Sequence, residues 1–187
     1  MTSPHDRATT GEPAPLILQG PRVVLRQVVP TDLPSLLEIL REPSVARVWS
    51  AANDEADREL LLGADPDGAE AITAFAITIS GRVIGWIAGW EKLEPEYRHA
   101  GVDLFVSGEQ QGMSHGPEAI RLVCDWLFLV RGHHRITIDP AASNLRAIAA
   151  YEKVGFQRVG VLRRYELGPD GTYHDGLLLD LVPEDLL

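Results

Sequence analysis

The stretch GEQQGMSHGPEAIRL, residues 108–122, places a small and nearly uncharged loop directly before an apolar helical run. Gly112 and Gly116 let the backbone approach a ligand closely, with N–H groups that no side chain obstructs. A helix N-terminus adds further N–H groups and a partial positive charge, so such a turn can hold an anion. The loop matches neither the nucleoside-triphosphate loop nor the dinucleotide-binding glycine pattern. It therefore predicts a pyrophosphate that is bound and not cleaved.

The segments around this loop predict a mixed α/β fold. Alternating apolar residues indicate strands, and apolar residues at helical spacing indicate helices. Gly81 and Arg82 lie between two strand-like runs and indicate a hairpin turn. The order of elements predicts a sandwich built on a central sheet. The predicted strands are 22–28, 71–80, 83–91, 99–107, 134–138, 157–167 and 172–182, and the predicted helices are 32–40, 43–49, 54–63, 143–155 and one that starts at Pro117.

The bulk composition narrows the functional classes. With 187 residues, the chain is long enough for one domain, which we expect at residues 18–187 after a disordered tail at 1–17. The net charge of −10 argues against nucleic acid as a partner and suits a cationic small substrate. No apolar run is long enough to span a membrane, and the single cysteine, Cys124, requires no oxidising compartment. We expect a cytoplasmic protein with no metal site, because the six histidines show no ligand spacing.

Two motifs carry a resemblance to a known family. The sequence Gln111-Gly-Met-Ser-His-Gly116 resembles the acetyl-CoA pyrophosphate loop of the GNAT superfamily of N-acetyltransferases, (Arg/Gln)-x-x-Gly-x-(Gly/Ala). Ser114 replaces the first glycine and is strained if the backbone there needs a positive φ. The segment DPAASNLRAIAAYEKVGF, residues 139–156, is similar to the strand–helix segment of the same superfamily, with its Asn, Tyr and closing Gly-Phe. The motifs occur in the family's order, and the resemblance covers residues 22–182.

The resemblance implies a fold and a co-substrate. The fold is an α/β domain with a mixed, mostly antiparallel central sheet of about six to seven strands flanked by helices. Acetyl-CoA is the co-substrate, and transfer is direct within a ternary complex that contains no metal. The implied cofactor-binding residues are Leu104, Phe105, Val106, Gln111, Gly112, Met113, Ser114, His115, Gly116, Asn144, Ala147 and Tyr151.

Two residues are candidates for proton transfer. The acceptor amine must be neutral to react, and the leaving thiolate benefits from an acid. The hydroxyl of Tyr151 could supply that acid, although the residue could equally be a half-buried core aromatic. Asp103 lies in an otherwise apolar strand, where an isolated carboxylate is costly to bury. It is the candidate base, and the alternative is a carboxylate paired with an arginine.

The acceptor is suggested by the same resemblance. The two motifs look most like those of the aminoglycoside 6′-N-acetyltransferases, in which acids meet the ammonium groups of the drug. Those acids correspond to Asp103 and Asp139. Trp49 and Trp90 could form aromatic walls and Glu91 could add charge, but both tryptophans could also be core residues.

Two other functions remain open at this point. The Arg-rich strand and the His-Asp hairpin in residues 160–182 favour a protein N-terminal acetyltransferase of the ribosomal-protein type. A non-catalytic acyl-CoA-binding regulatory module is the alternative from another class. Whether the protein is a monomer or a homodimer cannot be read from these patterns, nor can the length of the acyl group.

Overall fold

A computed structural model defines the fold. The predicted tail, residues 1–17, lies almost wholly outside the described residues, and its last residue, Ile17, begins a short strand. The division into a tail and one domain at 18–187 stays a prediction. The structure describes residues 15–49, 54–64, 68, 70–168 and 170–187.

Within the described residues, eight strands form one sheet in the order β1-β2-β3-β4-β5-β6-β8-β7. Each neighbouring pair is antiparallel except β5 and β6, which run parallel. The mixed, mostly antiparallel sheet is thus confirmed. It has one strand more than expected because β1 is too short to show an alternating pattern. The strands are β1 (Ile17–Gln19), β2 (Val24–Gln27), β3 (Ala71–Ile79), β4 (Arg82–Lys92), β5 (His99–Val106), β6 (Ile136–Ile138), β7 (Gln157–Leu167) and β8 (Tyr173–Leu181).

The turn between β3 and β4 differs by one residue from the predicted one. Ile79 pairs with Arg82, so the two turn residues are Ser80 and Gly81 and not Gly81 and Arg82. Both have positive φ, 49° and 80°. A two-residue hairpin of this handedness needs positive φ at both positions, which the sequence signalled only through the glycine.

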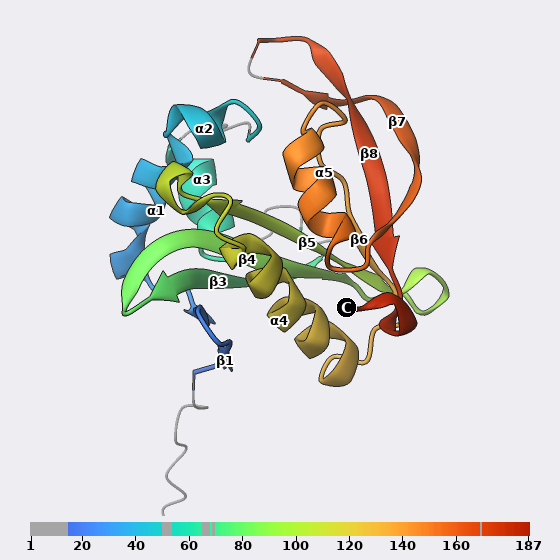
Figure 1. Cartoon of the computed structure of the whole chain (residues 1–187), viewed down its shortest axis with the longest axis horizontal. Coiled ribbons are helices and arrows are strands. Elements are labelled where there is room, and N and C mark those ends of the chain that lie inside the picture. The colour runs from blue at the N-terminus through green and yellow to red at the C-terminus, as the bar shows by residue number, and fades with distance from the viewer. Residues whose placement is uncertain (1–14, 50–53, 65–67, 69, 169) are drawn as a thin grey trace, which may run out of the picture.

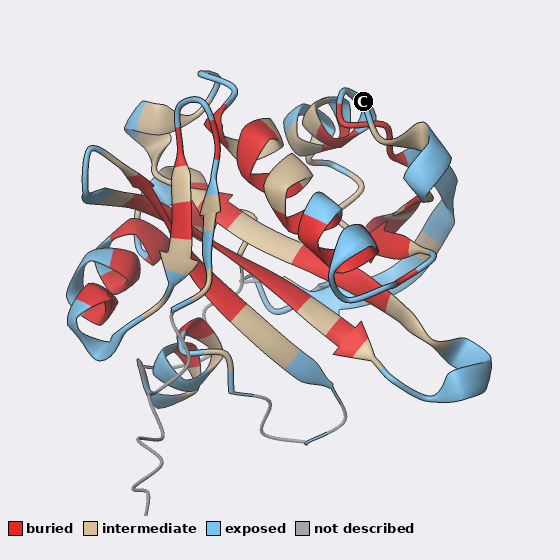
Figure 2. Ribbon diagram, turned by 90° about the horizontal axis from the view of Figure 1, so that it is seen from below, coloured by how far each residue is buried: buried red, intermediate tan, exposed pale blue. Residues whose placement is uncertain are grey.

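Helices cover both faces of the sheet (Figure 1). On one face α1, α2 and α3 cover a buried cluster that includes Trp86 and Phe105. On the other face α4 and α5 cover a larger cluster that includes Phe75 and Leu127, and Figure 2 shows buried segments in the strands and helices alike. The described helices are all too short or too polar to cross a bilayer. The α-helices are α1 (Leu33–Leu40), α2 (Pro43–Ala46), α3 (Asp54–Leu61), α4 (His115–Leu129) and α5 (Leu145–Glu152), and the 3-10 helices are η1 (Pro30–Asp32), η2 (Pro95–Tyr97), η3 (Gly108–Gln110) and η4 (Pro183–Asp185).

The two parallel strands separate soon after they meet. β5 and β6 pair only at Ala100 with Ile136 and at Gly101 with Thr137. Beyond Gly101, no described strand pairs with this side of β5. The last residues of β5 and the residues that follow β6 therefore border a common cavity.

Candidate active site

A cavity of about 940 Å³ lies where β5 and β6 diverge, bordered by the first turn of α4 and one side of α5. A space of this size can hold a ligand of drug size or larger. Four of the predicted site residues, Trp90, Glu91, Met113 and His115, do not line it. The predicted residues that do line it are Trp49, Asp103, Leu104, Phe105, Val106, Gln111, Gly112, Ser114, Gly116, Asp139, Asn144, Ala147 and Tyr151.

The donor-rich loop closes one end of the cavity with backbone groups. Helix α4 begins at His115, before the predicted start at Pro117, and Ser114 is its N-cap. Gly112, Ser114 and Gly116 line the cavity, so the N–H groups of this turn border the space where an anion would bind. The side chain of His115 is buried, and its Nδ1 atom has no partner within the described part of the chain. His115 does not line the cavity, so its implied side-chain contact with the cofactor is corrected to a buried position at the start of α4.

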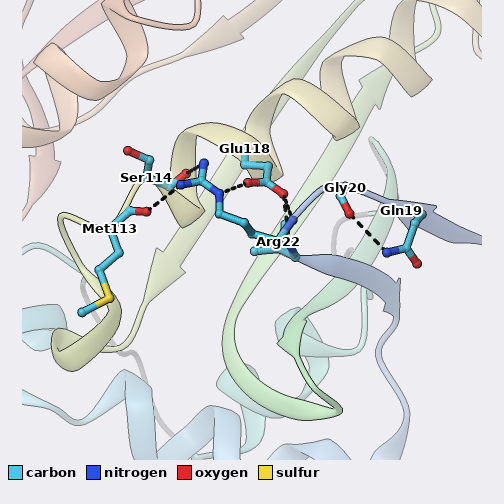
Figure 3. A network of polar contacts seen from close by, with 7 residues as sticks. Gln19, Gly20, Arg22, Met113, Ser114 and Glu118 are labelled. Carbon is cyan, nitrogen blue, oxygen red and sulfur yellow. Dashed lines mark hydrogen bonds and ion pairs between the residues drawn. The ribbon is translucent and has the colours of Figure 1, made fainter.

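An ion pair holds the loop from its outer side (Figure 3). The Arg22 guanidinium donates to the carbonyls of Met113 and Ser114 at 3.2 and 3.5 Å, and to the Glu118 carboxylate at 2.6 Å. Met113 thus contributes a carbonyl to this network and no side chain to the cavity. Glu118 also accepts the N–H groups of Arg22 and Val23. Burial opposes ionisation of Glu118, but these donors outweigh it and hold its pKa below the usual range.

A second arginine contacts the loop from α5, and the sequence interpretation missed it. The Arg146 guanidinium donates to the side-chain oxygen of Gln111 at 3.0 Å, and the Gln111 amide donates to the Val106 carbonyl at 2.9 Å. A Cβ on Gly112 would lie 3.3 Å from the same guanidinium. Arg146 lines the cavity beside the predicted pyrophosphate turn. A cation in the first turn of a helix is unfavourable, because it lies at the positive end of the helix dipole. The unusual position of Arg146 is therefore the sequence signal that could have identified it as a functional residue.

Ser114 has φ 64° and ψ 15°, a left-handed conformation that costs a non-glycine residue about 1 kcal/mol. We predict that Ser114→Gly raises the free energy of unfolding by about 0.5 kcal/mol, because part of this relief is offset by the greater chain entropy of unfolded glycine. Urea unfolding measures the change. Ser114→Ala is the matched control, because alanine keeps the strain. Equal stabilisation by alanine and glycine would show that φ is not the cause.

Trp90 lies beside Asp103 on the same face of the sheet and does not line the cavity. Its ring lies across Gly101, where an added Cβ would come within 2.0 Å of the indole. The indole lies close enough to the Asp103 carboxyl group to lower its pKa, against the larger effect of burial. Trp90, Gly101 and Asp103 thus lie on one face of the sheet, and the predicted contact between Trp90 and substrate is corrected to a contact with Asp103.

Asp103 is half-buried on the cavity wall. Its pKa is raised to about 7, first by burial and then by the negative charges of Asp139 and Glu70. The charged neighbours that act on it are carboxylates and not arginines, which favours a functional carboxylate over an ion-paired one. A carboxyl group with this pKa can take a proton from an amine near neutral pH.

Tyr151 lies in the core and also borders the cavity. It is buried, its ring lies 6.3 Å from that of Phe156, and the residue also lines the cavity. Burial, followed by the charges of Asp103 and Asp139, raises the pKa of its hydroxyl. The hydroxyl therefore keeps its proton at neutral pH and can donate it.

Two further predicted residues shape the start of α5. Asn144 is the N-cap of this helix, and its side-chain oxygen accepts the N–H of Ala147 at 3.3 Å. An asparagine in this position stabilises the first turn. Both residues also line the cavity, so this N-cap fixes the helix start at the cavity wall.

Carboxylates and aromatic rings line the part of the cavity wall that follows β6 and lies along β7. Asp139 directly follows β6 and lines the cavity together with Tyr165 and Glu166 of β7, two residues that the sequence interpretation did not select. The Tyr165 hydroxyl donates to Asp139 at 2.5 Å. Burial and the charge of Asp139 raise the pKa of Glu166. Trp49 lines the cavity as predicted and packs edge-on against Phe105, with ring centroids 5.3 Å apart.

Glu91 lies on the opposite face of the sheet from Trp90, and its predicted contact with substrate is wrong. Adjacent residues on a strand point to opposite faces, so the two could not both face the cavity. Glu91 is 1 % exposed and is bound by Arg131 at 3.0 Å and by His133 at 2.7 Å. Its partners are thus two residues that follow the end of α4.

The described residues show no other reactive centre that the sequence suggested. No three His, Cys, Asp or Glu side chains among them gather closely enough to hold a metal ion. Cys124 is fully buried in the α4 cluster, and burial raises the pKa of its thiol.

Comparisons with known proteins agree with this geometry. Residues 22–157 match the model of the acetyltransferase (GNAT) domain. The chain is 29 % identical over 165 residues to the aminoglycoside N(6′)-acetyltransferase type 1 of Klebsiella pneumoniae, covering 80 % of this chain and 79 % of that protein. The structure of AAC(6′)-Ib in complex with ribostamycin and coenzyme A superposes with a TM-score of 0.72 at 25 % identity, covering 88 % of this chain and 95 % of the other. Mycobacterium smegmatis RimJ in complex with CoA-disulfide shares the fold, with a TM-score of 0.75 at 22 % identity over 92 % of this chain and 87 % of the other.

Proposed function

Because the chain belongs to the GNAT acetyltransferase family and is an N-acetyltransferase, we propose that it transfers acetyl from acetyl-CoA to a primary amine of a polycationic small molecule, an aminoglycoside. The observation that carries this proposal is the division of one cavity into two ends. Backbone N–H groups and Arg146 border one end, and the carboxylates Asp103, Asp139 and Glu166 line its wall elsewhere. The relative from Klebsiella pneumoniae, which is named as an aminoglycoside N(6′)-acetyltransferase, supports the choice of acceptor.

The donor end fits the diphosphate of acetyl-CoA. The turn at Gly112–Gly116 offers N–H groups at the start of α4, and Arg146 adds a positive charge beside it. The last residues of β5, Leu104 to Val106, lie unpaired on the side that faces the cavity. Their backbone groups can pair with the amide groups of the pantetheine arm, as an added strand would.

Asp103 is proposed as the base and Tyr151 as the acid. Asp103 takes a proton from the acceptor ammonium, so that the amine can attack the thioester. The thioester supplies the acetyl group. As the carbon–sulfur bond breaks, Tyr151 gives its proton to the departing sulfur, because its raised pKa keeps it protonated until negative charge develops nearby. The second proton, which the acetylated nitrogen loses, restores the Tyr151 hydroxyl.

We predict that Tyr151→Phe lowers kcat by about 10²-fold or more, since the ring is kept and only the donated proton is lost. Steady-state kinetics and thermal unfolding should be measured on the same samples. The melting temperature should stay close to that of the parent. A lower melting temperature with unchanged kcat would instead assign Tyr151 to the core alone.

The acceptor choice is tested by a thiol-release assay with acetyl-CoA against kanamycin, spermidine and a short peptide with a free N-terminus. We expect the highest kcat/KM with kanamycin, because several carboxylates line the cavity wall. A preference for the peptide would favour the N-terminal acetyltransferase, a function that the exposed β7–β8 hairpin would suit. If the protein bound acetyl-CoA but released no coenzyme A with any of the three amines, the proposed function would be contradicted.

A further inference from the structure

Strand β7 is interrupted at the position that faces the cavity. Leu162 pairs with Gly176, and the next paired residue, Glu166, faces His174. Three residues of β7 therefore oppose the single residue Asp175 of β8. A bulge of this kind turns side chains away from the direction that regular alternation would give them.

The bulge is held in a strained but defined conformation. Arg164 has φ 51°, which is unfavourable for a residue with a long side chain. Its backbone N–H donates to the Asp175 carboxylate at 2.8 Å, which ties the bulge to β8. Gly176 of β8 leaves room for the ring of Tyr165, the residue after Arg164, since a Cβ on Gly176 would lie 2.9 Å from that ring. These contacts together bring Tyr165 over β8 and into the cavity wall.

The segment after β6 is fixed to the same strand. The Pro140 carbonyl accepts the N–H of Leu177 at 2.9 Å, and the N–H of Ala142 donates to the Asp175 carbonyl at 2.8 Å. The backbone beside Asp139 is therefore held on β8, and the freedom that remains is rotation of the carboxylate. The Tyr165 hydroxyl, donating at 2.5 Å to Oδ2 of Asp139, removes that freedom.

We propose that Tyr165 is a positioning residue of the acetyl transfer: the β7 bulge delivers its hydroxyl to Asp139 and so fixes that carboxylate toward the acceptor amine. This inference rests on the proposed function. The groups that face Asp139 are Asp103 from β5, Glu166 from β7 and Tyr151 from α5. Two of these are carboxylates that repel it, so a fixed donor is needed to keep Asp139 in place.

The test is a double-mutant cycle with Tyr165→Phe and Asp139→Ala, using acetyl-CoA and kanamycin. Tyr165→Phe should raise the KM for kanamycin on the order of tenfold, as expected for a lost hydrogen bond to a charged group, and leave the KM for acetyl-CoA unchanged. In the Asp139→Ala background, Tyr165→Phe should have no further effect. Gly176→Ala, which displaces the ring and keeps the hydroxyl, should repeat both results. Tyr173→Phe, an exposed tyrosine on β8, is the matched control and should match the parent.

The outcomes separate this inference from the proposed function. If Tyr165→Phe raised the KM for kanamycin equally in the parent and in Asp139→Ala, or in neither, the inference would be overturned. Turnover of kanamycin by the parent would still uphold the proposed function. The same cycle is read by calorimetry with kanamycin alone. Kanamycin binding that depends on Tyr165 only when Asp139 is present would support the inference even if the parent released no thiol. Neither binding nor turnover of kanamycin would overturn both.

Discussion

Replacing Asp103 with asparagine is expected to lower kcat with a cationic acceptor by about 10²–10⁴-fold, the usual contribution of a positioned base. The affinity for acetyl-CoA should remain within about twofold, because Asp103 lies in β5 and is not part of the turn at the start of α4 that is proposed to bind the diphosphate. Steady-state kinetics and calorimetry with acetyl-CoA measure the two effects. Asp125→Asn, on the exposed side of α4, is the matched control. Equal kinetics in Asp103→Asn and the parent would remove Asp103 from the mechanism.

The same residue sets the expected pH dependence. The base must be ionised to act, and the pKa of Asp103 is about 7. For the parent, kcat/KM should therefore rise with pH and level off above about pH 7. Asp103→Asn should lose this limb, and the same acceptor should be used for both proteins because its amine also titrates.

Stability should change with pH in the opposite direction. Asp103 binds its proton more tightly in the folded state, with a pKa of about 7, than in the unfolded chain, where a value of about 3.9 is usual. The protonated carboxyl group contributes its full stabilisation at a pH below the pKa of the unfolded chain. This contribution is lost as the pH rises through the pKa of the folded state. Asp103→Asn should therefore melt at a higher temperature than the parent at pH 8, and this difference should shrink at pH 4. A carboxyl group that costs stability when ionised but is needed for turnover is typical of an active site.

Gly116→Asp is expected to abolish acetyl-CoA binding, weakening it on the order of 100-fold or more. A Cβ at this position would lie 3.7 Å from Leu104 and 3.8 Å from Val106, so the side chain fits against β5 without unfolding the turn. Its carboxylate would then stand in the cavity at the start of α4, where the diphosphate is proposed to bind. Two like charges in that space repel each other strongly.

The control for this prediction is Gly160→Asp, because a Cβ on Gly160 would meet nothing within 4 Å. It adds the same charge to the protein far from the turn and should leave acetyl-CoA affinity unchanged. Calorimetry measures both variants, and thermal unfolding checks that both are folded. Unchanged affinity in Gly116→Asp would show that the diphosphate does not bind at this turn.

Much of the fold could be predicted because its elements have regular patterns. Short apolar runs in β3, β4 and β5 and helical spacing in α4 and α5 place these elements close to their observed bounds. The predicted positions of the β3–β4 turn and of the start of α4 were wrong by one and two residues. Each observed boundary depends on a serine with positive φ, Ser80 or Ser114, and the sequence gives no sign of that conformation.

The candidate site was predicted less completely, for physical reasons. Glu91 was selected by its charge although strand alternation opposes its pairing with Trp90. Tyr165 could not be selected, because its direction depends on the bulge, and the bulge depends on a positive φ at Arg164 and on a carboxylate of the neighbouring strand. Alternation without the bulge gives a different facing side chain.

The short pairing between β5 and β6 divides the sheet into two halves joined along a narrow seam. The turn proposed to bind the diphosphate belongs to the first half, whereas Asp139, Tyr165 and Glu166 belong to the second. Substitutions in the outer hairpin can thus reshape one wall of the cleft without disturbing the turn. Such modularity would let a family retain one acyl donor while its members diverge in the amines they accept.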